Sequence, residues 1–166
     1  MKTSNKTGYG IWLNLTLAAC AVFFFSCLMG DIFGYSVCDF YWKGTLSNEG
    51  YVSCLSFLSD EKVRFYVFLT CFYLSTILTY PIIYCVVNLV MNIKKEKIFD
   101  KANTRLMTII TACCFLICLI CLIGAAATYF LFVISLVGLF VGLVVQCVRL
   151  VMDKAIDMRN ELDLTV

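Results

Sequence analysis

The sequence contains no histidine, a single proline and few charged side chains, which make up 14% of its 166 residues. Without histidine it lacks the commonest acid–base catalyst and metal ligand of proteins. Charges are missing altogether from residues 7–30, 65–93 and 106–148, so no carboxylate is predicted inside these stretches. Proton relays and ion-coupled carriers nearly always place an ionisable group inside the membrane. These absences disfavour an enzyme, a metal or cofactor site and proton-coupled transport. The one proline, Pro81, lies in the second stretch and is predicted to kink a helix there.

The three uncharged stretches are long and apolar, in a chain whose residues are 62% hydrophobic. A membrane-spanning helix needs about 20 apolar residues, so the first two stretches hold one span each and the third holds two, separated near Gly124. Strands are excluded because an isolated pair would leave backbone groups unpaired in lipid. The sequence therefore predicts an all-α integral membrane four-helix bundle, as a single domain over residues 1–166. Its spans are predicted at residues 10–30, 65–91, 105–124 and 129–151.

Lysine and arginine residues predict the orientation, because they are retained on the cytoplasmic side of a membrane. Ten of the thirteen lie in or beside the N-terminal segment, the loop 92–104 and the tail 152–166, against three in or beside the loop 31–62. Both termini are therefore predicted to lie in the cytoplasm, below the plasma membrane, with residues 31–62 as the one sizeable outer loop. Because the basic residues flank the spans, they indicate topology and not direct binding of nucleic acid.

The first predicted span also contains a lipoprotein-like cleavage box, Leu17, Ala18, Ala19 and Cys20. Cleavage there would leave Cys20 as a lipidated first residue. The following residues, 21–29, stay strongly apolar, whereas a lipoprotein usually turns polar at once. An uncleaved span is therefore favoured, with lipidation of Cys20 as the alternative.

Two of the eleven cysteines, Cys38 and Cys54, lie outside the predicted spans, in the loop on the oxidising side. They are candidates for a disulfide, although no spacing rule fixes their pairing. In the third span, Cys118 and Cys121 form a C-x-x-C pair, which some four-helix membrane thiol oxidases use beside a quinone. A reactive thiolate favours a helix N-terminus or a cationic neighbour, whereas these two lie among apolar residues near a helix C-terminus. Thiol oxidoreduction is therefore one alternative function, and a small channel or immunity-type membrane protein is another.

Polar residues inside the spans are few. Asn14, Asn88 and Gln146 are all predicted at the cytoplasmic end, where they could form an interhelical hydrogen-bond layer or serve as packing contacts. Gly138 and Gly142 in the fourth span have the G-x-x-x-G spacing that lets another helix approach closely. That helix is predicted to belong to the same chain, with a homo-oligomer as the alternative.

The two cytoplasmic segments carry a family resemblance. Asp100 is predicted to cap the third helix, and the fourth helix is predicted to continue into the tail, with Arg149 and Asp153 one turn apart. The order Phe99, Asn103, Leu106 before the third span and the ending Glu161-Leu-Asp-Leu-Thr-Val resemble the bacterial family catalogued as domain of unknown function 2975. Members usually have a glycine shortly before that phenylalanine, where this chain has Glu96 and Lys97.

What the resemblance implies is a small four-span protein of the kind often encoded beside a compact helix-turn-helix regulator. By analogy, the chain is predicted to be a non-enzymatic regulatory or sensory partner of such a cytoplasmic DNA-binding regulator, with membrane lipid as its other surrounding. The predicted partner surface consists of Phe99, Asn103, Arg105, Glu161, Asp163, Leu164 and Thr165.

Overall fold

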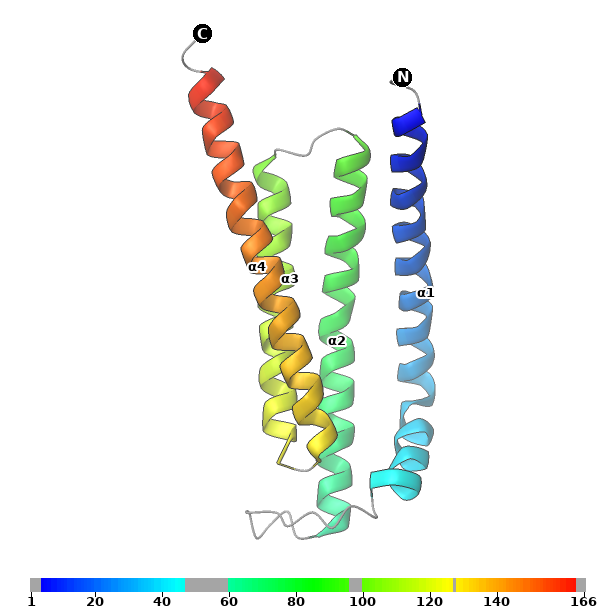
Figure 1. Cartoon of the computed structure of the whole chain (residues 1–166). Helices are drawn as coiled ribbons and strands as arrows, with labels where there is room; N and C mark the ends of the chain where they lie inside the picture. The colour runs from blue at the N-terminus through cyan, green and yellow to red at the C-terminus, as the bar shows by residue number, and fades with distance from the viewer. Residues whose placement is uncertain (1–3, 47–59, 96–99, 127, 164–166) are drawn as a thin grey trace.

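The computed structural model describes residues 4–46, 60–95, 100–126 and 128–163 of the chain. Within these ranges the regular structure is helical throughout (Figure 1). The elements are α1 (Ser4–Tyr41), the short π-helix η1 (Trp42–Leu46), α2 (Glu61–Lys94), α3 (Lys101–Gly124) and α4 (Tyr129–Asp163). All four α-helices are long and apolar enough to cross a membrane. The predicted all-α class with four candidate spans is confirmed.

The helices continue beyond the apolar stretches that identified them. α1 does not end near Gly30 but runs through residues 31–41 into η1, so the prediction that a loop begins at residue 31 is wrong. α4 continues past residue 151 to Asp163, as predicted for the tail. The reason is that a charged residue marks where a helix can leave the hydrocarbon core, whereas backbone hydrogen bonding stops only at a capping or turn signal.

The helices pack as a row and not as a closed bundle. α2 packs on α1 and α3, and α3 packs on α2 and α4, while no extended packing joins α1 to α4 within the described residues. The start of α1, the end of α2, the start of α3 and the last turns of α4 share one end of the molecule, which we call the α2–α3 end (Figure 1). The opposite end is called the α3–α4 end. Within the described residues, α2 is therefore the helix on which α1 packs most extensively.

Close packing at the α3–α4 end depends on small residues. A Cβ atom added to Gly124 would lie 2.6 Å from Cys71 Sγ and 2.7 Å from Leu131 Cδ1. Cys71 and Leu131 belong to the larger buried cluster, which also contains Cys38, Trp42, Phe68 and Cys121. Gly124 thus lets the end of α3 approach α2 at Cys71. Because α2 begins at Glu61, it extends about 15 Å further than this level, at about 1.5 Å per residue.

The fourth helix uses its two glycines against α3. A Cβ on Gly142 would lie 3.3 Å from Phe115 Cε1, and a Cβ on Gly138 would lie 3.9 Å from Cys118 Cβ. The face of the G-x-x-x-G pair is therefore occupied by a helix of the same chain. Pro81 lies inside α2, as its position in the second stretch requires.

Candidate functional site

Asp100 fixes the start of α3 at the α2–α3 end. Its carboxylate Oδ1 accepts a hydrogen bond from the backbone N–H of Ala102 at 3.0 Å, and its carbonyl oxygen accepts one from the N–H of Asn103 at 2.9 Å. The residue itself has extended backbone angles, as an N-cap residue should. The predicted cap is confirmed, and it sets the direction in which α3 leaves the connection.

A buried amide pair joins the end of α2 to the start of α3. Asn92 Nδ2 donates to Asn103 Oδ1 at 2.8 Å, and Asn103 is 0% exposed. An unpaired amide at such a position would cost free energy, so the hydrogen bond specifies how the two helices meet. Asn103 was predicted to contact a protein partner, but the structure places its side chain in the interior. Asn103 therefore helps to position the start of α3 and is not itself part of the exposed surface.

A polar cavity of about 560 Å³ adjoins this pair. Its lining combines the carboxylate of Asp100 with the cations of Lys101 and Arg105, and with the amides of Asn88 and Asn92. Arg105, a predicted partner residue, is exposed at its rim. A wall carrying both signs of charge and amide groups can bind a polar or charged chain segment.

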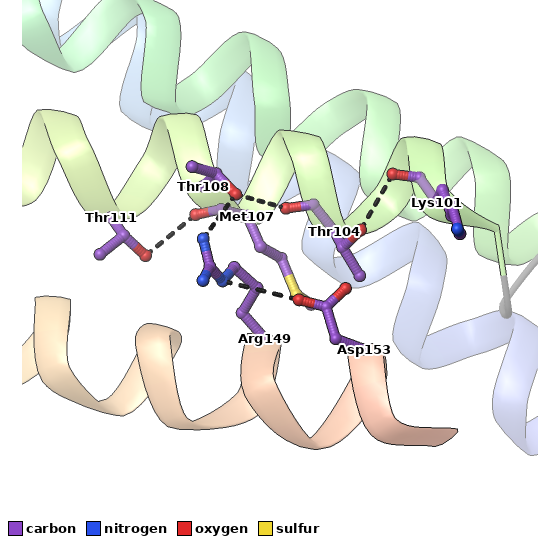
Figure 2. A network of polar contacts seen from close by, with 7 residues as sticks. All are labelled: Lys101, Thr104, Met107, Thr108, Thr111, Arg149 and Asp153. Atoms are coloured by element: carbon purple, nitrogen blue, oxygen red, sulfur yellow. Dashed lines mark hydrogen bonds and ion pairs between the residues drawn. The ribbon is translucent and has the colours of Figure 1, made fainter. Parts of the chain in front are cut away.

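Threonines on α3 connect this end to α4 (Figure 2). Thr108 Oγ1 donates to the carbonyl oxygen of Thr104 at 2.9 Å and accepts a hydrogen bond from Arg149 Nη1, also at 2.9 Å. Arg149 also forms the predicted ion pair along α4, its Nε lying 3.9 Å from Asp153 Oδ2. The contact of Arg149 with Thr108 was not predicted, although threonines at 104, 108 and 111 repeat at helical spacing and mark the face that meets α4.

The last turns of α4 stand further out than the end of α2 and the start of α3 (Figure 1). Ile156 is buried at 4% exposed, whereas Met158 and Leu162 are 59% and 68% exposed. Residues four apart lie on the same side of a helix, so Met158 and Leu162 form one apolar strip, which we call the tail strip. Charged, exposed side chains lie around it, namely Lys154, Asp157, Arg159 and Glu161.

The remaining predicted partner residues are described only in part. Glu161 is exposed, and Asp163 is the last residue of α4. Phe99, Leu164 and Thr165 lie outside the described residues. The tail strip was not part of the predicted surface, although two apolar residues at helical spacing among charges could have identified it.

The predicted polar layer is not formed as a set of hydrogen bonds. Asn14 Oδ1 accepts from Lys94 Nζ at 2.6 Å, and Asn88 Nδ2 donates to the carbonyl oxygen of Tyr84 at 3.0 Å. In the described part of the chain, no hydrogen bond joins Asn14, Asn88 and Gln146 to one another. Since α1 does not pack along α4, Asn14 and Gln146 have no shared interface in which to meet.

Three of the four cysteines in the two thiol hypotheses lie in the described residues, and these three are buried. Cys38 carries a free thiol and is 2% exposed inside the larger cluster, while Cys54 lies outside the described residues. Cys118 Sγ lies 3.3 Å from Ser135 Oγ, and Cys121 Sγ lies 3.8 Å from Ser75 Oγ. Among the described residues, no three side chains of the metal-binding types are grouped closely enough to hold an ion.

A carboxylate does lie within a helix that could span the membrane. Asp31 sits inside the candidate span of α1, where its Oδ2 accepts a hydrogen bond from the hydroxyl of Tyr80 on α2. Its Oδ1 is buried and has no hydrogen-bond partner in the described part of the chain. The prediction that no carboxylate falls inside a span took the first span to end at residue 30, and the helix continues beyond that residue.

Comparison with known proteins gives one family. No curated protein and no solved structure matches the chain. The profile of a family described as "Protein of unknown function (DUF2975)" matches residues 55–166, which contain α2, α3 and α4 and therefore the amide pair, the threonine contacts and the tail strip. The chain is a multi-span membrane protein that belongs to the DUF2975 family.

Proposed function

We propose that the protein is a non-enzymatic membrane partner of a cytoplasmic regulator, which it holds at the α2–α3 end. The observation that carries this proposal is the tail strip, because Met158 and Leu162 are exposed on α4, which extends past the end of α2 and the start of α3. In the proposal this end faces the cytoplasm, in keeping with the ten lysines and arginines that lie in or beside its segments.

The tail strip has the chemistry of a helix that docks in a groove of another protein. Apolar side chains spaced by one turn serve as anchors in that mode of recognition, and surrounding charges set the orientation of the partner. Met is a frequent anchor at such surfaces because its flexible side chain fits irregular grooves. Ile156 is buried on the same turns, which holds this part of α4 in place while the strip stays exposed.

The polar cavity lies at the same end of the molecule and is proposed as a second contact. Asp100, Lys101 and Arg105 stand at its wall, and Asn103 fixes the helix that carries them. A partner seated on the tail strip would meet both signs of charge there. Such charges add specificity and association rate more than affinity. The regulator class, a helix-turn-helix DNA-binding protein, rests on the family resemblance.

The test is co-purification from native cells. The full-length protein carries an N-terminal tag, is extracted in mild detergent, and its soluble companions are quantified by mass spectrometry. Leu162→Glu and Met158→Glu each put a charge on the tail strip, and we expect each to lower the companion at least tenfold. Asn160→Glu places the same charge on another side of the same turn and serves as the matched control.

Two outcomes oppose the proposal in different ways. Equal recovery of the companion with all three variants shows that the tail strip is not the docking surface. A companion that depends on the strip but is not a DNA-binding protein refutes the regulator class and leaves the surface in place.

A further inference from the structure

A second cavity, of about 510 Å³, lies at the other end of the molecule, where nothing in the proposed function uses it. All four helices contribute to its lining, and none of the lining residues is charged. The hydroxyls of its two threonines are occupied within α2: Thr76 Oγ1 donates to the carbonyl oxygen of Phe72 at 2.9 Å, and Thr79 Oγ1 donates to that of Ser75 at 2.8 Å. The walls therefore offer contacts to hydrocarbon. We call this cavity the side slot.

The arrangement of the helices gives the side slot an opening toward lipid. Val37 and Tyr41 of α1 line one side of it, and Phe130 and Ile134 of α4 line the other. Because no extended packing joins α1 to α4 among the described residues, helix contacts within these ranges do not close the space between these walls. A bilayer lipid can enter from the side, and an apolar slot that stayed empty would lose the dispersion contacts of its lining.

A cation lies next to the side slot on its outward side. Arg64 is one helical turn before the lining residue Phe68, and its guanidinium carbon lies 5.7 Å from the ring centre of Trp42. Its Nε is buried without a hydrogen-bond partner among the described residues. The nearby carboxylate of Glu61 is engaged, since its Oε1 accepts from Trp42 Nε1 at 3.3 Å. Arg64 therefore has an unused donor for an acidic group.

The depth of Arg64 suits a lipid headgroup. The turn between α3 and α4 has to lie near the edge of the hydrocarbon core, because its backbone groups need water. Cys71 is level with that turn, through its contact with Gly124, and Arg64 lies about 10 Å further out along α2 at about 1.5 Å per residue. We propose that the side slot binds one acyl chain of an anionic phospholipid, with the phosphate of its headgroup at Arg64.

The two tryptophans of the chain make this binding measurable. Trp12 is 70% exposed on α1, whereas Trp42 is 4% exposed and packs in the buried cluster with lining residues of the side slot. With Trp12→Phe as the background, Trp42 is the sole emitter. The protein is reconstituted into phosphatidylcholine vesicles that contain increasing fractions of phosphatidylglycerol brominated on its acyl chains, since bromine quenches tryptophan only at short range.

We expect brominated phosphatidylglycerol to quench Trp42 at a several-fold lower fraction of the lipid than brominated phosphatidylcholine does. Arg64→Gln should remove this difference, with each emission normalised to vesicles of the same headgroup without bromine. Equal quenching by both lipids in the unmutated protein would overturn the assignment of the headgroup to Arg64.

Filling the side slot tests the acyl chain. Ile134→Phe adds volume at a lining residue, and Thr79→Leu does so from α2 as a second variant, should the first fail to fold. Val137→Phe is the matched control, on an α4 residue that is 58% exposed and does not line the slot. We expect either filling variant to abolish the low-fraction quenching and the control to keep it. Unchanged quenching in the filled variants refutes the site. The site is also refuted if the unfilled protein shows no quenching and has the mass of a dimer, because a second copy would then close the slot.

Discussion

The strongest quantitative prediction concerns Gly124, where α3 meets both α2 and the start of α4. In Gly124→Ala the new methyl carbon would lie 2.6 Å from Cys71 Sγ and 2.7 Å from Leu131 Cδ1, so both side chains have to move. Overpacking of this kind costs about 1–3 kcal/mol. Alanine is the better helix former by up to about 1 kcal/mol, and this gain is only partly realised at the last residue of a helix. We expect a net loss of about 1–2 kcal/mol in the free energy of unfolding.

Gly138→Ala is the control with the opposite expected sign. Its methyl carbon would have Cys118 Cβ as nearest neighbour, at an ordinary contact distance of 3.9 Å. Nothing has to move, so the helix preference of alanine decides, and we expect a gain of about 0.5–1 kcal/mol.

The buried thiols supply the assay. A maleimide that fluoresces on reaction with cysteine reports unfolding in detergent, because most of the helical cysteines are buried in the folded protein. For a chain of this size 1 kcal/mol corresponds to about 2–4 °C in the midpoint, so Gly124→Ala should lower it by about 2–8 °C. Cys71→Ala in the Gly124→Ala background removes one of the two clashing atoms and should show favourable coupling of at least about 0.5 kcal/mol. Shifts of the same sign and size for both glycine variants would refute the packing argument.

Three further predictions address the contacts between helices. Asn92→Ala and Asn103→Ala should each destabilise the protein by about 1–3 kcal/mol, and a double-mutant cycle in the same assay should give coupling of about 1 kcal/mol; additive effects would mean that the amide pair is not an interaction. Tyr80→Phe removes the hydrogen-bond donor to Asp31 and should lower the unfolding midpoint. Tyr84→Phe, at a residue 69% exposed, should change the midpoint little, and equal losses would contradict the assigned pair. If the tail lies in the cytoplasm, green fluorescent protein fused to the C-terminus should fluoresce and alkaline phosphatase fused there should stay inactive. The reverse result would show that the predicted orientation is wrong.

The positions of the four helices could be predicted because lipid excludes charge so strongly that gaps in the charge pattern are sufficient evidence. The ends of α1 could not, since Asp31 has a hydrogen-bond donor on α2 and the helix continues past it. Helix pairing was also out of reach. Lipid and protein interior are similarly apolar, so the face of α1 that meets α2 looks no different in sequence from the face that meets lipid.

For the candidate site, the polar residues of the sequence indicated where the site lies but not what each side chain does there. Asp100 was predicted as a cap because capping depends on one residue and its immediate neighbours. Asn103 was assigned to the partner surface because it belongs to the segment that carries the family resemblance, and only the structure shows Asn92 opposite it. The tail strip was not predicted because Met158 and Leu162 follow a long apolar segment of the same helix and do not stand out from it in sequence.

The row-like packing makes α1 a lipid-supported helix. None of the residues in the most apolar part of α1 is buried by the described protein. The faces of α1 that do not pack on α2 are therefore open to the bilayer. A membrane that becomes thicker or thinner is matched by a change of helix tilt, at a modest cost for each ångström. Because α1 packs mainly on α2, a change in its tilt would alter the angle between α1 and the other three helices, while α2, α3 and α4 keep their mutual contacts. The contacts of Asn14 with Lys94, of Asp31 with Tyr80 and of Cys38 in the buried cluster would restrain that change.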